Sequence, residues 1–237
     1  MTKRQIMNNK YKNKLFSILG DSISTLEKYS VPDDAVYYEG YNKLRTNVFA
    51  PSDTWWGQVI DTLGGELLVN NSFAGSMVSK HPNCEITSYG CSDKRTSDLG
   101  KYGFTPDIIM VFLGVNDWGY GVKPTLEDDM EEDISIFSCA YSQMLEKLCK
   151  NYPNAEIWCL TLPVTTCNSE EGFTFPYVYS KYHIEEYCKI IHACAKKQGC
   201  RVIDLYNSHQ MPDTVEGFHP NKDGMKALAE AVLNQLK

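Results

Sequence analysis

Short apolar runs alternate along the chain with stretches of helical periodicity. The runs have the length of buried strands and are rich in β-branched residues. They are Leu15–Leu19, Leu67–Val69, Ile108–Leu113, Ile157–Leu162 and Val202–Leu205. Strands that alternate with helices predict a mostly parallel sheet with helices on both faces. Five strands in one domain predict a flavodoxin-like three-layer α/β/α sandwich, in which ligands bind at the carboxyl ends of the strands.

Four stretches between the predicted strands place apolar residues on one face of a helix. The faces consist of Trp55, Trp56, Val59, Ile60 and Leu63; of Leu126, Met130, Ile134, Phe137, Tyr141, Met144, Leu145 and Leu148; of Tyr187, Ile190, Ile191 and Cys194; and of Met225, Leu228, Ala229, Val232 and Leu236. Thr125 and Asp128 form a capping-box pattern before the second face. The acidic run Glu127–Asp133 fits the first turns of that helix, because the helix dipole favours negative charge there.

The longest stretch without a regular pattern is Val31–Ser52. Loops of this length in compact domains often take part in function. The stretch contains Pro32, Gly40, Tyr37, Tyr38 and Tyr41.

Length and composition favour one globular domain. The chain has 237 residues, of which 43% are hydrophobic, and this suffices for one substantial core. We therefore expect a single domain over residues 1–237, with residues 1–14 as a short N-terminal extension. A net charge of −7 disfavours nucleic acid and anionic membranes as partners. No apolar run approaches the roughly 18 residues of a transmembrane helix.

Two features favour a cytoplasmic protein. The segment MTKRQIMNNKYKNKLFSILG lacks the apolar region and the cleavage site of a signal peptide. The nine cysteines follow no repeating spacing and are expected to be reduced thiols. A leader removed before the first residue stays open as an alternative. The sequence does not indicate an oligomeric state.

The candidate nucleophile follows the first predicted strand. Apolar residues run into Gly20, Asp21 and Ser22, where a helix is expected to begin. This places the Ser22 hydroxyl at the carboxyl end of the strand, where backbone amides point toward a substrate. The alternative is that Ser22 only caps a helix, as serines after strands commonly do.

A serine nucleophile needs a base, and His219 is the best placed of the five histidines. It lies in the segment Glu216–Asn221, whose Gly and Pro predict a loop. Glu216 can accept a bond from the imidazole Nδ1–H and so fix the tautomer. His192 and Cys188 have a spacing that suits a metal pair, but without a further ligand nearby we expect an ordinary helix face.

Two further loops can supply hydrogen-bond donors. Gly75 follows the second strand, and its backbone N–H can approach a substrate closely. Asn116 follows the third strand, and its side-chain amide can donate directly. The structural alternatives are a simple turn at Gly75 and an Asx-turn at Asn116.

In their order along the chain, four segments resemble the signature blocks of the SGNH (GDSL) hydrolase family: Gly20-Asp21-Ser22, Gly75, Gly114-Val115-Asn116-Asp117 and His219-Pro220-Asn221. The resemblance covers Leu15–Leu236 and implies a flavodoxin-like fold. It implies Ser22 as nucleophile and His219 as base. It also implies that the backbone N–H groups of Ser22 and Gly75 and the side chain of Asn116 form the oxyanion hole.

The chain departs from this family at the third triad position. The last family block is Asp-x-x-His, whereas Glu216 stands three residues before His219 here. Glu does the same work in other triads, and Asp213 is the alternative candidate. The segments Asp53–Gly57 and Asn116–Gly121 resemble a bacterial branch of the family.

The resemblance implies hydrolysis of a carboxylic ester through an acyl-enzyme, with no metal or organic cofactor. We expect a small-molecule or carbohydrate ester as the substrate. Acyl transfer on the same site and a non-catalytic flavodoxin-like binding domain are the alternatives. A flavin site is disfavoured because the chain has no Gly-rich phosphate loop. Several aromatic side chains are expected either to stack on a sugar ring or to pack internally. They are Trp55, Trp56, Trp118, Tyr120, Tyr37, Tyr38 and Tyr41.

Overall fold

The computed structural model describes residues 10–30, 35–80, 88–125, 133–164, 181–208 and 212–236. Its centre is a five-stranded parallel sheet in the order β2-β1-β3-β4-β5. The strands are β1 (Leu15–Gly20), β2 (Glu66–Ser72), β3 (Ile108–Phe112), β4 (Glu156–Leu160) and β5 (Arg201–Ile203). All five predicted strands are present, and this order is the flavodoxin-like one. The predicted fold class is therefore confirmed.

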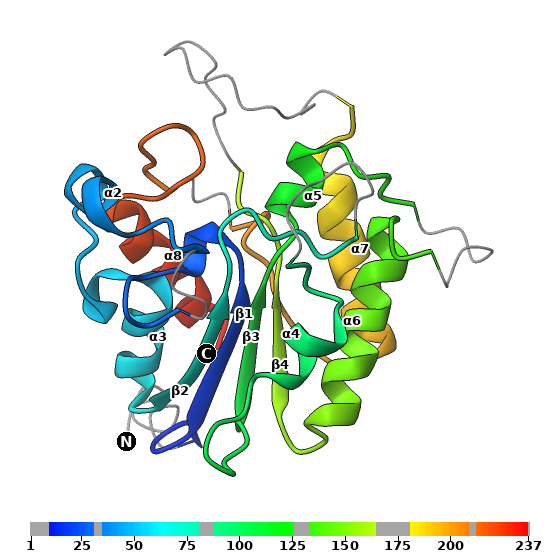
Figure 1. Cartoon of the computed structure of the whole chain (residues 1–237), viewed down its shortest axis with the longest axis horizontal. Coiled ribbons are helices and arrows are strands. Elements are labelled where there is room, and N and C mark those ends of the chain that lie inside the picture. The colour runs from blue at the N-terminus through cyan, green and yellow to red at the C-terminus, as the bar shows by residue number, and fades with distance from the viewer. Residues whose placement is uncertain are drawn as a thin grey trace.

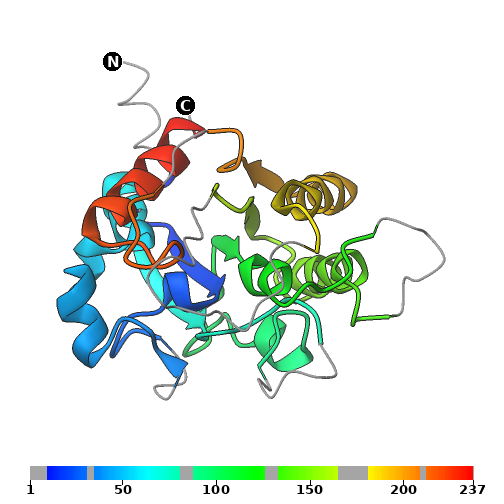
Figure 2. The same ribbon diagram turned by 90° about the horizontal axis from the view of Figure 1, so that it is seen from above.

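Helices cover both faces of the sheet (Figure 1). Helices α3 (Trp55–Leu63) and α8 (Lys222–Asn234) pack together on one face, and α6 (Phe137–Asn151) and α7 (Ile184–Lys197) pack together on the other. Figure 2 shows the same three layers from above. The shorter elements are α2 (Gly40–Thr46), α4 (Asp93–Ser97), α5 (Val115–Gly119) and the 3-10 segments η1 (Ser22–Ser24) and η3 (Pro51–Asp53). None of the helices within the described ranges has the length and apolar character needed to cross a membrane.

Two sequence expectations are wrong in their extent. The second predicted helix was expected to begin near Leu126, but α6 begins at Phe137. Its start is delayed because Asp133 forms an Asx-turn, in which its carboxylate accepts the backbone N–H of Ser135 at 2.9 Å. Residues 126–132, with Asp128 and most of the acidic run, lie outside the described part of the chain.

The stretch Val31–Ser52, expected to be irregular, contains the helix α2, although residues 31–34 lie outside the description. Helix α2 ends at Thr46, and the next residue, Asn47, adopts the left-handed conformation with φ 56°. Asn tolerates this conformation better than most residues and so terminates the helix.

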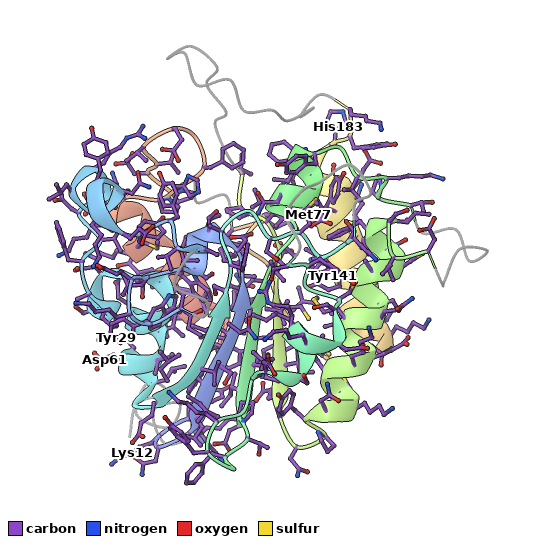
Figure 3. The ribbon with its side chains drawn as sticks, viewed as in Figure 1. Lys12, Tyr29, Asp61, Met77, Tyr141 and His183 are labelled. Atoms are coloured by element: carbon purple, nitrogen blue, oxygen red, sulfur yellow. The ribbon has the colours of Figure 1, made fainter. Side chains whose placement is uncertain are left out.

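The parallel strands bring four connections to one edge of the sheet. These are the segment after β1, the segment after β2, helix α5 after β3, and the loop that precedes α8 (Figure 1). Figure 3 shows Met77, from the segment after β2, near this edge, whereas Lys12 lies at the opposite end of the sheet. The carboxyl edge therefore assembles side chains that are far apart in sequence.

Candidate active site

Ser22 is the first residue of η1, directly after β1. Asp21, not Ser22, caps this segment, because the Asp21 carboxylate accepts the backbone N–H of Ile23 at 3.0 Å. The sequence-based alternative that Ser22 only caps a helix is therefore wrong. The Ser22 hydroxyl instead lies 2.9 Å from Nε2 of His219.

His219 lies in a tight loop that folds back on itself before α8. Thr214 and Pro220 form an antiparallel bridge, and the Val215 N–H donates to the His219 carbonyl at 3.0 Å. Gly217 turns the chain between them with φ 90°, a conformation that side chains disfavour. The loop therefore presents Glu216 and His219 toward the same side.

Glu216, and not Asp213, contacts the second nitrogen of the imidazole. Oε1 of Glu216 is hydrogen-bonded to Nδ1 of His219. Asp213 instead accepts the side-chain amide of Asn221 at 2.7 Å, where it supports the start of α8. The contacts therefore run in an unbroken line from Ser22 through His219 to Glu216, although the first two residues are 197 positions apart.

The loop after β2 and helix α5 are tied to each other. The Asn116 side-chain amide donates to the Ser76 carbonyl at 2.9 Å, beside Gly75, which has a φ of 78°. The next residue, Asp117, accepts the backbone N–H groups of Val78 at 2.8 Å and Ser79 at 3.0 Å. Both predicted donors, Gly75 and Asn116, therefore belong to one hydrogen-bonded unit.

A buried arginine from α4 fastens this unit to the strand ends. Arg95 donates to the carbonyls of Gly20 at 2.9 Å and Asn71 at 2.8 Å, and to the Ser76 hydroxyl at 2.8 Å. Burial lowers the pKa of Arg95 to about 10, which still leaves it charged at neutral pH. Arg95 leaves no local pattern in the sequence, because its partners lie at the end of β1, on β2 and in the loop after β2.

Burial favours a neutral imidazole, whereas hydrogen bonds and positive charge favour an ionised carboxylate. Burial lowers the pKa of His219, and the bond and charge of Glu216 offset this only in part, so the pKa lies below its ordinary value. Burial raises the pKa of Glu216, but the bonds from His219 and Tyr37 and the charge of Arg45 outweigh it. His219 is therefore ready to accept a proton at neutral pH.

Two other carboxyl groups near the site have raised pKa values, in contrast to the lowered pKa of Glu216. Burial raises the pKa of Asp21 to about 7 and that of Asp117 to about 6. Hydrogen bonds from backbone N–H groups lower both values but do not outweigh burial. These groups consequently titrate close to the pH range in which a histidine does.

The predicted aromatic residues have several different roles. Trp55 and Trp56 are 0% and 1% exposed, so they pack in the core and do not reach a substrate. Tyr38 is also fully buried and donates to the Pro220 carbonyl at 2.9 Å. Tyr37 stacks on His219, and Tyr41 is 76% exposed on α2.

Among the residues that the structure describes, no cluster of three or more His, Cys, Asp or Glu side chains has the geometry of a metal site. His192, which has metal-pair spacing with Cys188, instead faces Asp204, with Nε2 3.1 Å from the carboxylate.

The fold and these contacts define an α/β protein with a serine–histidine–carboxylate arrangement at the carboxyl edge of its sheet. The family described as GDSL-like lipase/acylhydrolase matches residues 14–236, and the chain belongs to this family. The resemblance found in the sequence is thereby confirmed.

Solved structures agree with this membership. A protein from Bacteroides ovatus assigned as a GDSL-like lipase is 27% identical, with a TM-score of 0.71 and coverage of 95% of this chain and 98% of that one. A second, from Bacteroides uniformis, is 29% identical, with a TM-score of 0.71 and coverage of 94% and 95%. An aryl esterase of M. smegmatis shares the fold at 15% identity, with a TM-score of 0.66 and coverage of 94% and 98%. No curated protein matches the sequence.

Proposed function

We propose that the protein is a carboxylic ester hydrolase that forms an acyl-enzyme on Ser22. The observation that carries this proposal is the unbroken line of contacts from the Ser22 hydroxyl through His219 to Glu216. Family membership supports the reaction class, since the family comprises lipases and acylhydrolases. Glu216 accepts the Nδ1–H bond and so keeps the imidazole in the tautomer whose Nε2, facing Ser22, carries no proton.

The proposed reaction has two proton-coupled halves. His219 Nε2 takes the Ser22 proton while Oγ attacks the ester carbonyl, and it then returns that proton to the leaving alcohol. An acyl-enzyme remains on Ser22. Water attacks it next, with its proton passing to Nε2, and the carboxylic acid leaves as the proton returns to Oγ. The sum is ester plus water to acid plus alcohol.

Three donors are proposed to bind the negative oxygen of each tetrahedral intermediate. They are the backbone N–H groups of Ser22 and Gly75 and the side-chain amide of Asn116. The bond from Asn116 to the Ser76 carbonyl supports this role, because it fixes the amide beside Gly75. Donors held in place before the reaction stabilise developing charge without reorganisation.

The proposal is tested with a panel of p-nitrophenyl acyl esters of increasing chain length and of acetylated sugars. Wild-type protein is expected to hydrolyse members of the panel, and Ser22→Ala serves as the blank for each. The acyl length and the alcohol that react fastest define the substrate class. Hydrolysis that persists unchanged in Ser22→Ala, or none across the panel, argues against the proposal.

We expect kcat/KM to rise with pH around a midpoint below about 6.5, the ordinary pKa of histidine. His219 must be neutral to act as base, and its lowered pKa moves the onset of activity to lower pH. A pH–rate profile on a neutral ester gives the midpoint, with circular dichroism as the check on folding. Because Asp21 titrates near the same range, the imidazole signal of His219 is followed by NMR in parallel. A rate midpoint that differs from the His219 titration contradicts the assignment.

A further inference from the structure

Tyr37 lies shortly before α2 and contacts the proposed triad. Its ring is stacked on the His219 imidazole, with ring centroids 3.4 Å apart and planes 9° from parallel. His219 is 8% exposed, so the stacked ring is one wall of its enclosure. A face-to-face contact of this kind restricts rotation of the imidazole about its Cβ–Cγ bond.

The Tyr37 hydroxyl acts on the carboxylate as well. It donates to Oε1 of Glu216 at 3.0 Å, the same oxygen that contacts Nδ1 of His219. Burial, followed by the Glu216 charge, raises the pKa of Tyr37 well above its ordinary value, so the hydroxyl stays protonated and remains a donor.

The position of Tyr37 is fixed from the side of the nucleophile. The Tyr37 backbone N–H donates to Oγ1 of Thr25 at 2.9 Å, and that hydroxyl donates to the Ser22 carbonyl at 2.8 Å. Tyr37 is therefore bonded to the segment that carries Ser22 and to the carboxylate of the loop that carries His219. One residue fixes the two halves of the site relative to each other.

Arg45, on α2, holds the other carboxylate oxygen. Its Nη1 lies 3.3 Å from Oε2 of Glu216, while Nη2 donates to the Val215 carbonyl at 3.0 Å. Oε2 is buried, and the Arg45 contact lacks the alignment of a hydrogen bond. The guanidinium therefore acts on Glu216 through its charge, and its bond to Val215 keeps it there.

The third triad position explains why such contacts are useful. Glu has one more side-chain torsion than Asp, and freezing a torsion costs conformational entropy. We infer that Tyr37 and Arg45 are positioning residues that immobilise the Glu216 carboxylate and the His219 ring, and so offset the extra torsional freedom of a Glu at the third triad position. The inference rests on the proposed function, since it assigns these residues to the same reaction.

Tyr37 and Arg45 also influence the pKa of the His219 imidazole. The groups that face it are Glu216, Ser22, the Tyr37 ring and the Arg45 charge. Removing the Arg45 charge removes a repulsion of the imidazolium. Removing the Tyr37 hydroxyl frees Oε1 of Glu216 from a competing donor, so the carboxylate becomes a better acceptor for the imidazolium. Both changes therefore raise the pKa of His219, while the Tyr37 ring stays in place in Tyr37→Phe.

The test uses Tyr37→Phe and Arg45→Met with matched controls. Tyr41→Phe makes the same change at an exposed tyrosine, and Lys43→Met removes a cation that pairs with Glu27. NMR titration gives the pKa of His219, and the rate at which a fluorophosphonate labels Ser22 reports activation of the nucleophile. Both measurements are independent of the natural substrate.

We expect Tyr37→Phe and Arg45→Met to raise the pKa of His219 and the controls to leave it unchanged. Loss of a hydrogen bond to a charged group predicts a labelling rate about 10- to 100-fold lower in Tyr37→Phe. In a Glu216→Gln background, Tyr37→Phe is expected to add less than about twofold, because residues that act as a unit are not additive.

The outcomes separate this inference from the proposed function. A wild-type Ser22 that resists labelling, together with the expected His219 shifts, overturns the hydrolase, while the contacts of Tyr37 and Arg45 with Glu216 and His219 are upheld. A labelling rate that stays at the wild-type value in both variants overturns the positioning role, whatever the pKa of His219. A full Tyr37→Phe effect in Glu216→Gln also overturns it, since Tyr37 would then act without Glu216.

Discussion

Replacing His219 with alanine is expected to lower kcat for ester hydrolysis by about 10⁴- to 10⁶-fold, the range seen when a triad base is removed. His219 Nε2 is 2.9 Å from the Ser22 hydroxyl, and without it no group takes the serine proton. His192→Ala is the matched control, since His192 is 43% exposed and faces Asp204. It is expected to retain near wild-type kcat. Equal losses in the two variants would mean that the base is misassigned.

The same contact predicts where a covalent inhibitor attaches. A fluorophosphonate is expected to label Ser22, and peptide mapping by mass spectrometry identifies the site. The label should be absent from Ser22→Ala and strongly slowed in His219→Ala. Label on Ser24, Ser72 or Ser76 with Ser22 unmodified would contradict the assignment of the nucleophile.

The strands and the Ser22–His219 pair were predictable for one physical reason. Each predicted strand is a local apolar pattern, and parallel strands must end at the same edge of a sheet. Once Ser22 was placed after β1 and His219 in the loop before α8, their convergence needed no information on side-chain packing. Gly75 and Asn116 follow from the same rule, since they come after β2 and β3.

The residues that surround the pair were not predictable in this way. Tyr37 and Arg45 contact Glu216 across 179 and 171 positions, and neither contact leaves a local pattern in the sequence. Tyr37 was identified only as one of several aromatics that could stack on a sugar, and Arg45 was not identified at all. Arg95 is similar, because it donates to three separate segments. Such residues are selected by packing, which a single sequence does not display.

The boundary errors have a related origin. The apolar periodicity before α6 extends through Ile134, but the helix begins only at Phe137 because the Asx-turn of Asp133 competes with it. Hydrophobic period therefore located the helix but not its first residue.

Glu216→Gln is expected to lower kcat by several orders of magnitude with little change in KM. The amide has nearly the shape of the carboxylate, so substrate binding and packing are retained. It no longer carries the charge that stabilises the imidazolium formed in the transition state, and it can turn its NH₂ toward Nδ1, which favours the wrong tautomer. An amide in place of the triad carboxylate costs about 10⁴-fold in a well-studied serine protease, and a loss confined to kcat marks an interaction made in the transition state.

Asp213→Asn is the matched control in the same loop, because it makes the same chemical change. Asp213 bonds to Asn221 and not to His219, so this variant is expected to keep kcat within a few-fold of wild type. Steady-state kinetics on one activated ester give kcat and KM for both variants. A near-normal kcat in Glu216→Gln points to a Ser22–His219 dyad if Asp213→Asn is also active, and to Asp213 as the third member if Asp213→Asn is inactive. A large loss confined to Glu216→Gln leaves Glu216 as the carboxylate on which the imidazolium depends, in agreement with the bond of Asp213 to Asn221.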